Sequence, residues 1–202
     1  FEPIAAASIG QVHRARTIDG RDIALKIQYP GVARSIDSDV DNMALLLRML
    51  NILPVELDTD GITAEAKRQL RQEADYLAEA GFLKEYTYLV RDNDRLLVPA
   101  VHDDLTSRRV LAMDYLPGEP LESLAAEGVD PALRDSVGAE LERLLFRELF
   151  EFRTMPTDPN FANYLYRPGD DQIVLLDFGS TVTFTRSFTE RYRHISRALI
   201  RG

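Results

Sequence analysis

Three side chains near the end of the chain have the types and the spacing of a metal-dependent nucleotide site. Asp158 and Asn163 lie five positions apart in Thr-Asp-Pro-Asn-Phe-Ala-Asn, and Asp177 follows fourteen positions later in Leu-Leu-Asp-Phe-Gly. This order supplies a carboxylate base and two oxygen ligands for a cation next to a bound nucleoside triphosphate. The trio therefore predicts that the chain handles ATP together with Mg²⁺.

The composition is compatible with this chemistry and narrows the range of partners. The chain has 202 residues, 45% of them hydrophobic, which is enough for a core in one domain or in two small lobes. Its formal net charge of −9 argues against nucleic acid as a partner, because binding to phosphate backbones depends on clustered lysine and arginine. The absence of cysteine excludes disulfides and thiolate metal sites.

The sequence also carries signs of its context. No apolar run is long enough to span a bilayer. The chain opens with Phe-Glu-Pro, without an initiator methionine or a signal-peptide layout, so we expect it to be a fragment.

The elements that would position the trio follow from local patterns. Asp19-Gly20 is a two-residue hairpin signal, and Leu116-Pro117-Gly118 marks a lobe boundary. The helix from 35 to 53 is apolar nearly all round, so we expect it to be covered on more than one side. Strands are expected at 9–18, 21–28, 96–101, 109–115, 163–166 and 173–176, and helices at 35–53, 62–86, 131–152 and 189–200.

The first thirty residues supply what the trio would need. Ile-Ala-Leu-Lys at 23–26 has the form of the kinase strand Val-Ala-Ile-Lys, whose lysine neutralises α- and β-phosphate oxygens. The segment 5–12 fits the register of the kinase Gly-x-Gly-x-x-Gly-x-Val loop, except that Ala5 and Ala7 replace the first two glycines. Alanine does not share the tolerance of glycine for positive φ, so the loop is expected to cover the nucleotide in a different way.

Five sequence blocks together resemble the UbiB-type (ADCK) atypical kinases, from residue 3 to about residue 185. They are Ala-Ala-Ala-Ser-Ile-Gly-Gln-Val-His at 5–13, Leu-Lys-Ile-Gln-Tyr-Pro-Gly-Val at 25–32, Glu-Ala-Asp-Tyr at 73–76, Thr-Asp-Pro-Asn-Phe-Ala-Asn at 157–163 and Leu-Leu-Asp-Phe-Gly at 175–179. The resemblance implies an α+β, bilobal protein-kinase-like fold. Residues 1–116 would form an antiparallel-sheet N-lobe with inserted helices, and residues 117–202 a mostly helical, truncated C-lobe.

The resemblance also implies roles for single residues. Lys26, Glu73 and Asp158 would be catalytic, with Glu73 as the ion-pair partner of Lys26, while Asn163 and Asp177 would bind the metal. Asp75, about 200° from Glu73 around a helix, is expected to contact the family's N-terminal extension. The nucleotide would be bound by Ala5, Ala6, Ala7, Ser8, Ile9, Gly10, Val12 and Lys26 and by the hinge residues Asp114, Tyr115 and Leu116.

Two departures bear on the substrate. The chain lacks the family's upstream Lys-x-Gly-Gln motif, which would shape the substrate mouth. Thr157 stands where a regulated protein kinase has arginine before its catalytic aspartate, and no Ala-Pro-Glu segment follows Asp177. A phosphorylated activation loop would therefore find no arginine partner, which argues against protein substrates.

The resemblance implies an ATP- and Mg²⁺-dependent phosphotransferase or ATPase that supports ubiquinone or related isoprenoid-lipid metabolism. Its partners would be the nucleotide, a lipid or membrane surface and ubiquinone-biosynthesis proteins. It would work in the bacterial cytoplasm, at the membrane periphery, or in a eukaryotic organelle. Two alternatives stay open: a nucleotide-binding pseudokinase scaffold, and a small-molecule phosphotransferase of the aminoglycoside or choline kinase type.

Overall fold

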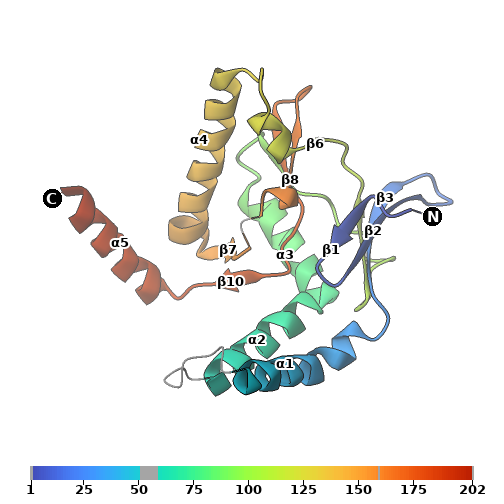
Figure 1. The fold of residues 1–202 in the computed structure, drawn as a ribbon. Helices are drawn as coiled ribbons and strands as arrows, with labels where there is room; N and C mark the ends of the chain where they lie inside the picture. The colour runs from blue at the N-terminus through green and yellow to red at the C-terminus, as the bar shows by residue number, and fades with distance from the viewer. Residues whose placement is uncertain (1, 51–58, 159, 202) are drawn as a thin grey trace. The chain divides into compact units, whose positions relative to one another are not determined.

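The computed structural model describes residues 2–50, 59–158 and 160–201, traced in Figure 1. They form two compact units, one from the described residues of 1–81 and 100–115, the other from those of 82–99 and 116–202. The units are thus not continuous in sequence, whereas the prediction placed all of 1–116 in one lobe. The assignment of lobes to 1–116 and 117–202 remains a prediction.

The first unit contains a four-stranded antiparallel sheet. Its order is β1 (Ala5–Ala7), β2 (Gly10–Arg16), β3 (Asp22–Gln28) and β5 (Val110–Asp114). β2 and β3 form the hairpin predicted at Asp19-Gly20, where Gly20 has a φ of 93°, a region that glycine reaches without steric cost. The register pairs Lys26 with Val12 on one side and with Leu111 on the other, so Lys26 lies in the interior of the sheet.

Two helices follow the hairpin, α1 (Val32–Met49) and α2 (Thr59–Glu73), and they lie side by side in Figure 1. Three ion pairs show that they run antiparallel: Arg71 with Asp37, Lys67 with Asp41, and Arg48 with Asp60. Each carboxylate is more than half exposed. Such pairs fix the register of two helices more than they add to stability.

The apolar surface of α1 is largely exposed, which corrects the expectation that this helix is covered on more than one side. Among its residues only Ile36 is buried. The exposed fraction is 57% for Met43, 54% for Leu45, 52% for Leu46 and 71% for Met49. An apolar pattern shows which side chains favour burial, but not whether a neighbouring element is present to cover them. Positions 51–53 of the predicted helix lie outside the described residues.

The single helix predicted over 62–86 is two helices, α2 and α3 (Tyr76–Leu89). Asp75 accounts for the break. Its Oδ1 accepts hydrogen bonds from the backbone N–H groups of Leu77 (3.1 Å) and Ala78 (3.3 Å), which is the arrangement of an N-cap. Both helices contain good helix formers, so propensity does not reveal the boundary. Asp75 lies between the two helices, so the expected angle of about 200° from Glu73, which assumed one continuous helix, is wrong.

The second unit combines helices with two small sheets. α4 (Pro131–Arg147) starts at Asp130, whose side chain caps it ahead of proline at the first helical position, and continues as a π-helix, η2 (Glu148–Phe152). One sheet has the order β4 (Leu96–Leu97), β9 (Gln172–Leu175), β8 (Tyr164–Arg167) and β6 (Glu119–Pro120). In the other, β7 (Thr154–Pro156) pairs with β10 (Thr181–Thr183). The remaining elements are η1 (Leu121–Ala125), η3 (Phe161–Asn163) and α5 (Arg186–Arg201).

The core of the second unit lies around the end of α3, β9 and the Asp-Phe-Gly segment. Leu83, Tyr86, Ile173, Val174 and Phe178 are each at most 1% exposed. β4 is shorter than the strand predicted over 96–101, because Pro99 has no N–H group to continue a ladder.

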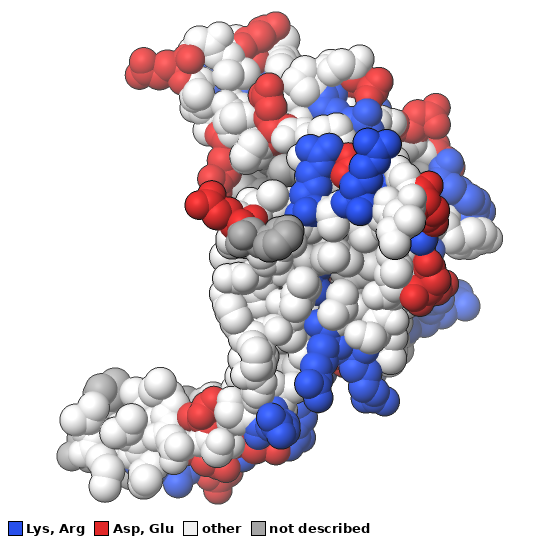
Figure 2. Space-filling model, turned by 90° about the vertical axis from the view of Figure 1, so that its right-hand side faces the viewer, with Lys and Arg blue, Asp and Glu red and all other residues white. Residues whose placement is uncertain are grey.

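The surface carries charges of both signs. On the face shown in Figure 2, basic side chains gather in small groups with acidic side chains beside them. The ion pairs at the surface of the described residues include Arg14 with Asp22 and Arg21 with Asp104. Pairs as exposed as these contribute little to stability.

Candidate active site

Lys26 is held by a buried ion pair within the first unit. Its side chain projects from β3 and is 6% exposed, and the Nζ donates to both carboxylate oxygens of Glu79, at 2.8 and 3.0 Å. Glu79 is 1% exposed and lies in the first turn of α3. The ring of Tyr76 lies 5.4 Å from the Nζ. The bidentate contact fixes the ammonium at one place on the sheet.

In the structure Lys26 thus forms a buried ion pair with Glu79, whereas the prediction named Glu73 as its partner. Glu73 is the last residue of α2, and its Oε2 accepts a hydrogen bond from the Oγ of Ser8 at 3.1 Å. The difference has the same cause as the merged helix, because Asp75 starts a new helix that carries Glu79 instead. An Asp N-cap followed by a glutamate within the first helical turn was the signal that could have found it.

The alanine-rich loop is a tight hairpin. Ala5 pairs with Val12 and Ala7 with Gly10, so the turn consists of Ser8 and Ile9. Ala5, Ala6 and Ser8 are exposed, while Ala7, Ile9 and Val12 are half-buried. The hydrogen bond from Ser8 to Glu73 ties the turn to the end of α2. The predicted nucleotide contacts of these residues remain predictions.

Gly10 has a packing reason for being glycine. A Cβ at this position would lie 2.2 Å from the carbonyl oxygen of Ile27 on the neighbouring strand, which no side chain tolerates. The hairpin is further held by the N–H of Tyr29, which donates to the carbonyl of Ile9 at 3.0 Å. The third glycine position of the loop is thus required by the close approach of β2 and β3.

The predicted hinge lies at the end of β5. Asp114 is the last residue of this strand, and its backbone N–H donates to the carbonyl of Ala100 at 2.9 Å. Its side chain lies 2.8 Å from the Nε2 of His102. Leu116 belongs to the second unit. The roles of Asp114 and Leu116 toward adenine remain predictions.

The trio of Asp158, Asn163 and Asp177 lines one small cavity in the second unit. Two strand pairings bring the segments together. β8 and β9 form a hairpin from Tyr164–Leu175 to Arg167–Gln172, and β7 pairs with β10. Asp158 follows β7 by two residues, and Asp177 follows β9 by two. The topology therefore places both carboxylates and the amide at one end of these strands.

Hydrogen bonds fix the two loops against each other. The N–H of Thr157 donates to the carbonyl of Ser180 at 3.0 Å, and its Oγ1 donates to the same carbonyl at 2.7 Å. The N–H of Leu176 donates to the carbonyl of Asn163 at 2.9 Å. The Oδ1 of Asp177 accepts from the N–H of Gly179 at 2.9 Å. Thr157, which stands where a regulated protein kinase has arginine, thus holds the two loops together.

The donor atoms fit a hard cation shared with a nucleotide. The Nδ2 of Asn163 lies 3.4 Å from the backbone carbonyl of Asp158, and this direction leaves the Oδ1 as the ligand atom of the amide. Within 2–50, 59–158 and 160–201, no cluster of three or more His, Cys, Asp and Glu side chains could hold a metal ion. Mg²⁺ typically takes one or two carboxylates and completes its shell with water and phosphate oxygens. The residues present suit Mg²⁺ that arrives with a nucleotide.

The sequence analysis missed two buried groups at this cavity, Glu148 and Tyr86. Glu148 lines the same cavity and is 7% exposed, and burial raises the pKa of its carboxyl to about 7. Its Oε1 lies 3.1 Å from the hydroxyl of Tyr86, whose pKa is also raised by burial. Burial, with Glu148 and Asp158 nearby, raises the pKa of Tyr164 to about 12. The only signal for Glu148 was its place four residues after Leu144, which continues the buried face of α4 into η2.

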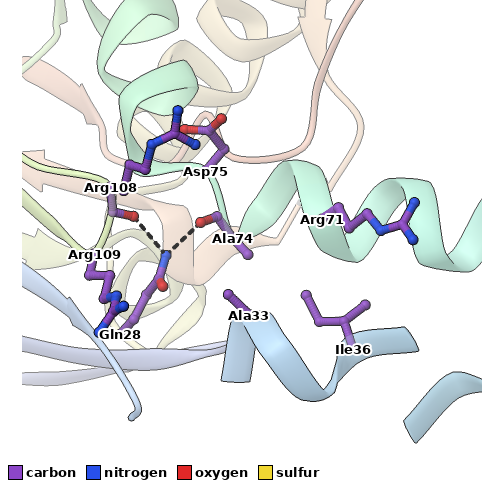
Figure 3. A pocket seen from close by; sticks show the side chains of 8 residues that line it. All are labelled: Gln28, Ala33, Ile36, Arg71, Ala74, Asp75, Arg108 and Arg109. Atoms are coloured by element: carbon purple, nitrogen blue, oxygen red, sulfur yellow. Dashed lines mark hydrogen bonds between the residues drawn. The ribbon is translucent and has the colours of Figure 1, made fainter. Parts of the chain in front are cut away.

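A second and larger cavity in the first unit contains none of the predicted catalytic or metal residues. Its volume is about 300 Å³, and it is lined by Gln28, Ala33, Ile36, Arg71, Ala74, Asp75, Arg108 and Arg109 (Figure 3). The Nε2 of Gln28 donates to the carbonyls of Ala74 (2.7 Å) and Arg108 (3.2 Å). In Figure 3 the guanidinium groups of Arg71, Arg108 and Arg109 point in different directions, so they do not converge on one ligand atom.

The architecture is that of a protein-kinase-like domain. The Rio2 kinase of Chaetomium thermophilum, solved as an ADP/Mg²⁺-phosphoaspartate complex, superimposes with a TM-score of 0.55 at 16% identity, covering 93% of this chain and 50% of that chain. Rv3197 of Mycobacterium tuberculosis, solved with erythromycin, superimposes with a TM-score of 0.75 at 30% identity, covering 90% of this chain and 46% of that chain. The predicted α+β, protein-kinase-like fold is confirmed.

Residues 1–202 match the ABC1 atypical kinase-like domain, and the chain belongs to this family. It is 42% identical over 200 residues to the mitochondrial atypical kinase COQ8B of Rattus norvegicus, covering 99% of this chain and 38% of that protein. It is 37% identical over 193 residues to the mitochondrial atypical kinase COQ8 of Saccharomyces cerevisiae, covering 96% and 38% respectively. The chain thus spans well under half of these relatives. The resemblance to UbiB-type atypical kinases is confirmed.

These relatives carry mitochondrial names. In the part of this chain that the structure describes, no helix combines the length and apolar character that a membrane span requires.

Proposed function

We propose that this protein binds ATP with Mg²⁺ and uses it as an atypical kinase or ATPase. The observation that carries the proposal is the convergence of Asp158, Asn163 and Asp177 on one cavity, which two strand pairings bring about. Family membership supports it, because the relatives are named atypical kinases. The Mg²⁺ and ADP of the Rio2 complex agree with this choice of cofactor.

The chemistry would be mainly positioning and neutralisation of charge. Bound Mg²⁺ supplies positive charge against the phosphate oxygens, and Asn163 and Asp177 would be its protein ligands. Lys26 would neutralise α- and β-phosphate oxygens, and Glu79 keeps its ammonium at a fixed position on β3. Asp158 is exposed, and its carboxylate would accept the proton of a hydroxyl or water whose oxygen bonds to the γ-phosphorus, as the bond between that phosphorus and the ADP oxygen breaks.

The acceptor would be water, a small molecule or a lipid, in support of ubiquinone or related isoprenoid-lipid metabolism. The confirmed resemblance supports this choice, and Thr157 supports it further. Thr157 bonds to Ser180 at the position where a regulated protein kinase uses arginine to bind a phosphorylated loop. A lipid or membrane surface and ubiquinone-biosynthesis proteins would be the further partners.

The test is ATP turnover by the protein, with and without lipid vesicles, for wild type and Asp177→Asn. Asp170→Asn is the matched control. This substitution removes the same charge, but in the turn of the β8–β9 hairpin, where Asp170 pairs with Arg167. We expect turnover in wild type and in the control, and its loss in Asp177→Asn. Equal turnover by Asp177→Asn would refute the proposed site. Nucleotide binding without turnover in every variant would instead support the scaffold.

A further inference from the structure

One aromatic side chain touches both segments that carry the carboxylates of the site. Tyr86, near the end of α3, is fully buried, and its ring centroid lies 4.4 Å from that of Phe178, the neighbour of Asp177. Its hydroxyl lies 2.8 Å from the backbone carbonyl of Thr154, on β7 and four residues before Asp158. Tyr86 therefore contacts the chain just before one carboxylate and just after the other.

The tyrosine hydroxyl is oriented by a buried carboxyl group. The Oε1 of Glu148 lies 3.1 Å from it, and Glu148 lines the cavity of Asp158, Asn163 and Asp177. Glu148 opens the π-helix η2, a departure from α-helical geometry that is frequent at functional sites because it redirects side chains. Thr154, whose carbonyl completes the group, is 1% exposed.

A purely structural explanation does not account for these residue types. Phenylalanine would fill the position of Tyr86 almost as well, and burial of a hydroxyl and a carboxyl carries a desolvation cost that an apolar core avoids. The contacts of the two polar groups explain their presence. The Tyr86 hydroxyl bonds to the Glu148 carboxyl and to β7, the strand that leads to Asp158. The arrangement is that of a support for the site.

We propose that Tyr86 and Glu148 are positioning residues that set the separation of Asp158 and Asp177. The Glu148 carboxyl fixes the Tyr86 hydroxyl, the hydroxyl fixes β7, and the ring fixes Phe178. The inference rests on the proposed function for its kinetic test, and has a second test that is independent of activity. A shift of one carboxylate by as little as 1 Å is expected to slow phosphoryl transfer strongly.

The kinetic test compares Tyr86→Phe, Glu148→Ala and Glu148→Gln with wild type in steady-state ATP turnover. We expect Tyr86→Phe and Glu148→Ala to lower kcat about 5- to 50-fold, with KM for MgATP within about twofold. Glu148→Gln keeps an amide that can donate to the tyrosine hydroxyl or accept from it, and it is expected to stay within about threefold of wild type. Tyr88→Phe, in the same helix at a position 63% exposed, is the matched control and should behave as wild type.

The independent test is amide hydrogen exchange of β7 and β10, which pair from Thr154–Thr183 to Pro156–Thr181. Tyr86→Phe should speed exchange in these strands about tenfold, while Tyr88→Phe leaves it unchanged. Wild-type kcat together with wild-type exchange in Tyr86→Phe would overturn the inference, as would equal losses in Glu148→Gln and Glu148→Ala. If wild type itself shows no turnover, the proposed function fails and hydrogen exchange alone decides on the positioning role.

Discussion

Loss of the Glu79 carboxylate should destabilise the protein strongly, because Lys26 would stay buried without its partner. Lys26 is 6% exposed and Glu79 is 1% exposed, and the ammonium bonds to both carboxylate oxygens. Breaking such a buried pair costs about 3–5 kcal/mol. For a domain of this size that corresponds to a decrease in Tm of about 6–20 °C. Thermal unfolding of Glu79→Ala by far-UV circular dichroism measures it, since the chain has no tryptophan for fluorescence.

Two further variants make the test specific. Glu73→Ala removes an exposed hydrogen bond to Ser8 and is expected to cost at most about 1.5 kcal/mol. The double replacement Lys26→Met with Glu79→Leu removes both charges and should recover most of the stability lost in Glu79→Ala. A loss in Glu73→Ala as large as that in Glu79→Ala, or an unchanged Tm in Glu79→Ala, would refute the reasoning.

Three other outcomes can be measured by denaturant unfolding. Gly10→Ala should destabilise the protein by about 2 kcal/mol or more, because the new Cβ would meet the carbonyl of Ile27. Gly138→Ala is the control: it lies in a helix with open space at the Cβ, and the change should stabilise the protein by about 0.5–1 kcal/mol. Asp75→Ala removes the N-cap of α3 and should cost about 1 kcal/mol. Burial raises the folded-state pKa of Glu148 to about 7, against an ordinary value of 4.5. The free energy of unfolding of metal-free protein should therefore fall by about 3 kcal/mol as pH rises from about 4.5 to about 7. Glu148→Gln should lack this loss, and parallel stability curves of wild type and variant against pH would contradict the prediction.

The titratable groups that bond to Glu148 or line the same cavity belong to four segments of the second unit. They are Tyr86 on α3, Tyr164 on β8, and Asp158 and Asp177 on the two loops. Bound Mg²⁺ would favour the ionised carboxyl, so the pH comparison requires a chelator.

The sequence predicted the features that depend on local chemistry or on motif order. Asp19-Gly20 located the first hairpin because few residue pairs suit its turn. Asp158, Asn163 and Asp177 were predicted together, and they line one cavity, because the short β8–β9 hairpin between two of them brings its ends together. For Asn163 and Asp177, the short separation along the chain therefore also predicts that they lie close together in the fold.

The features that depend on tertiary contacts were not predictable in the same way. Glu79 was overlooked because a good helix-forming sequence conceals the break at Asp75, and only the cap geometry reveals it. The exposure of α1 depends on which elements lie against it, and the apolar pattern of the helix itself does not show this. Tyr86 and Glu148 are 62 positions apart, and nothing in either local sequence indicates that they meet.

The most direct test of the account is equilibrium binding of ATP to the wild-type protein and to Asp177→Asn, by isothermal titration calorimetry with saturating Mg²⁺ and with excess EDTA. The account predicts that wild type binds ATP at least about tenfold more tightly with Mg²⁺, and that Asp177→Asn loses most of this difference, because Asp177 is a metal ligand. Equal affinity of wild type for ATP with Mg²⁺ and with EDTA would contradict it.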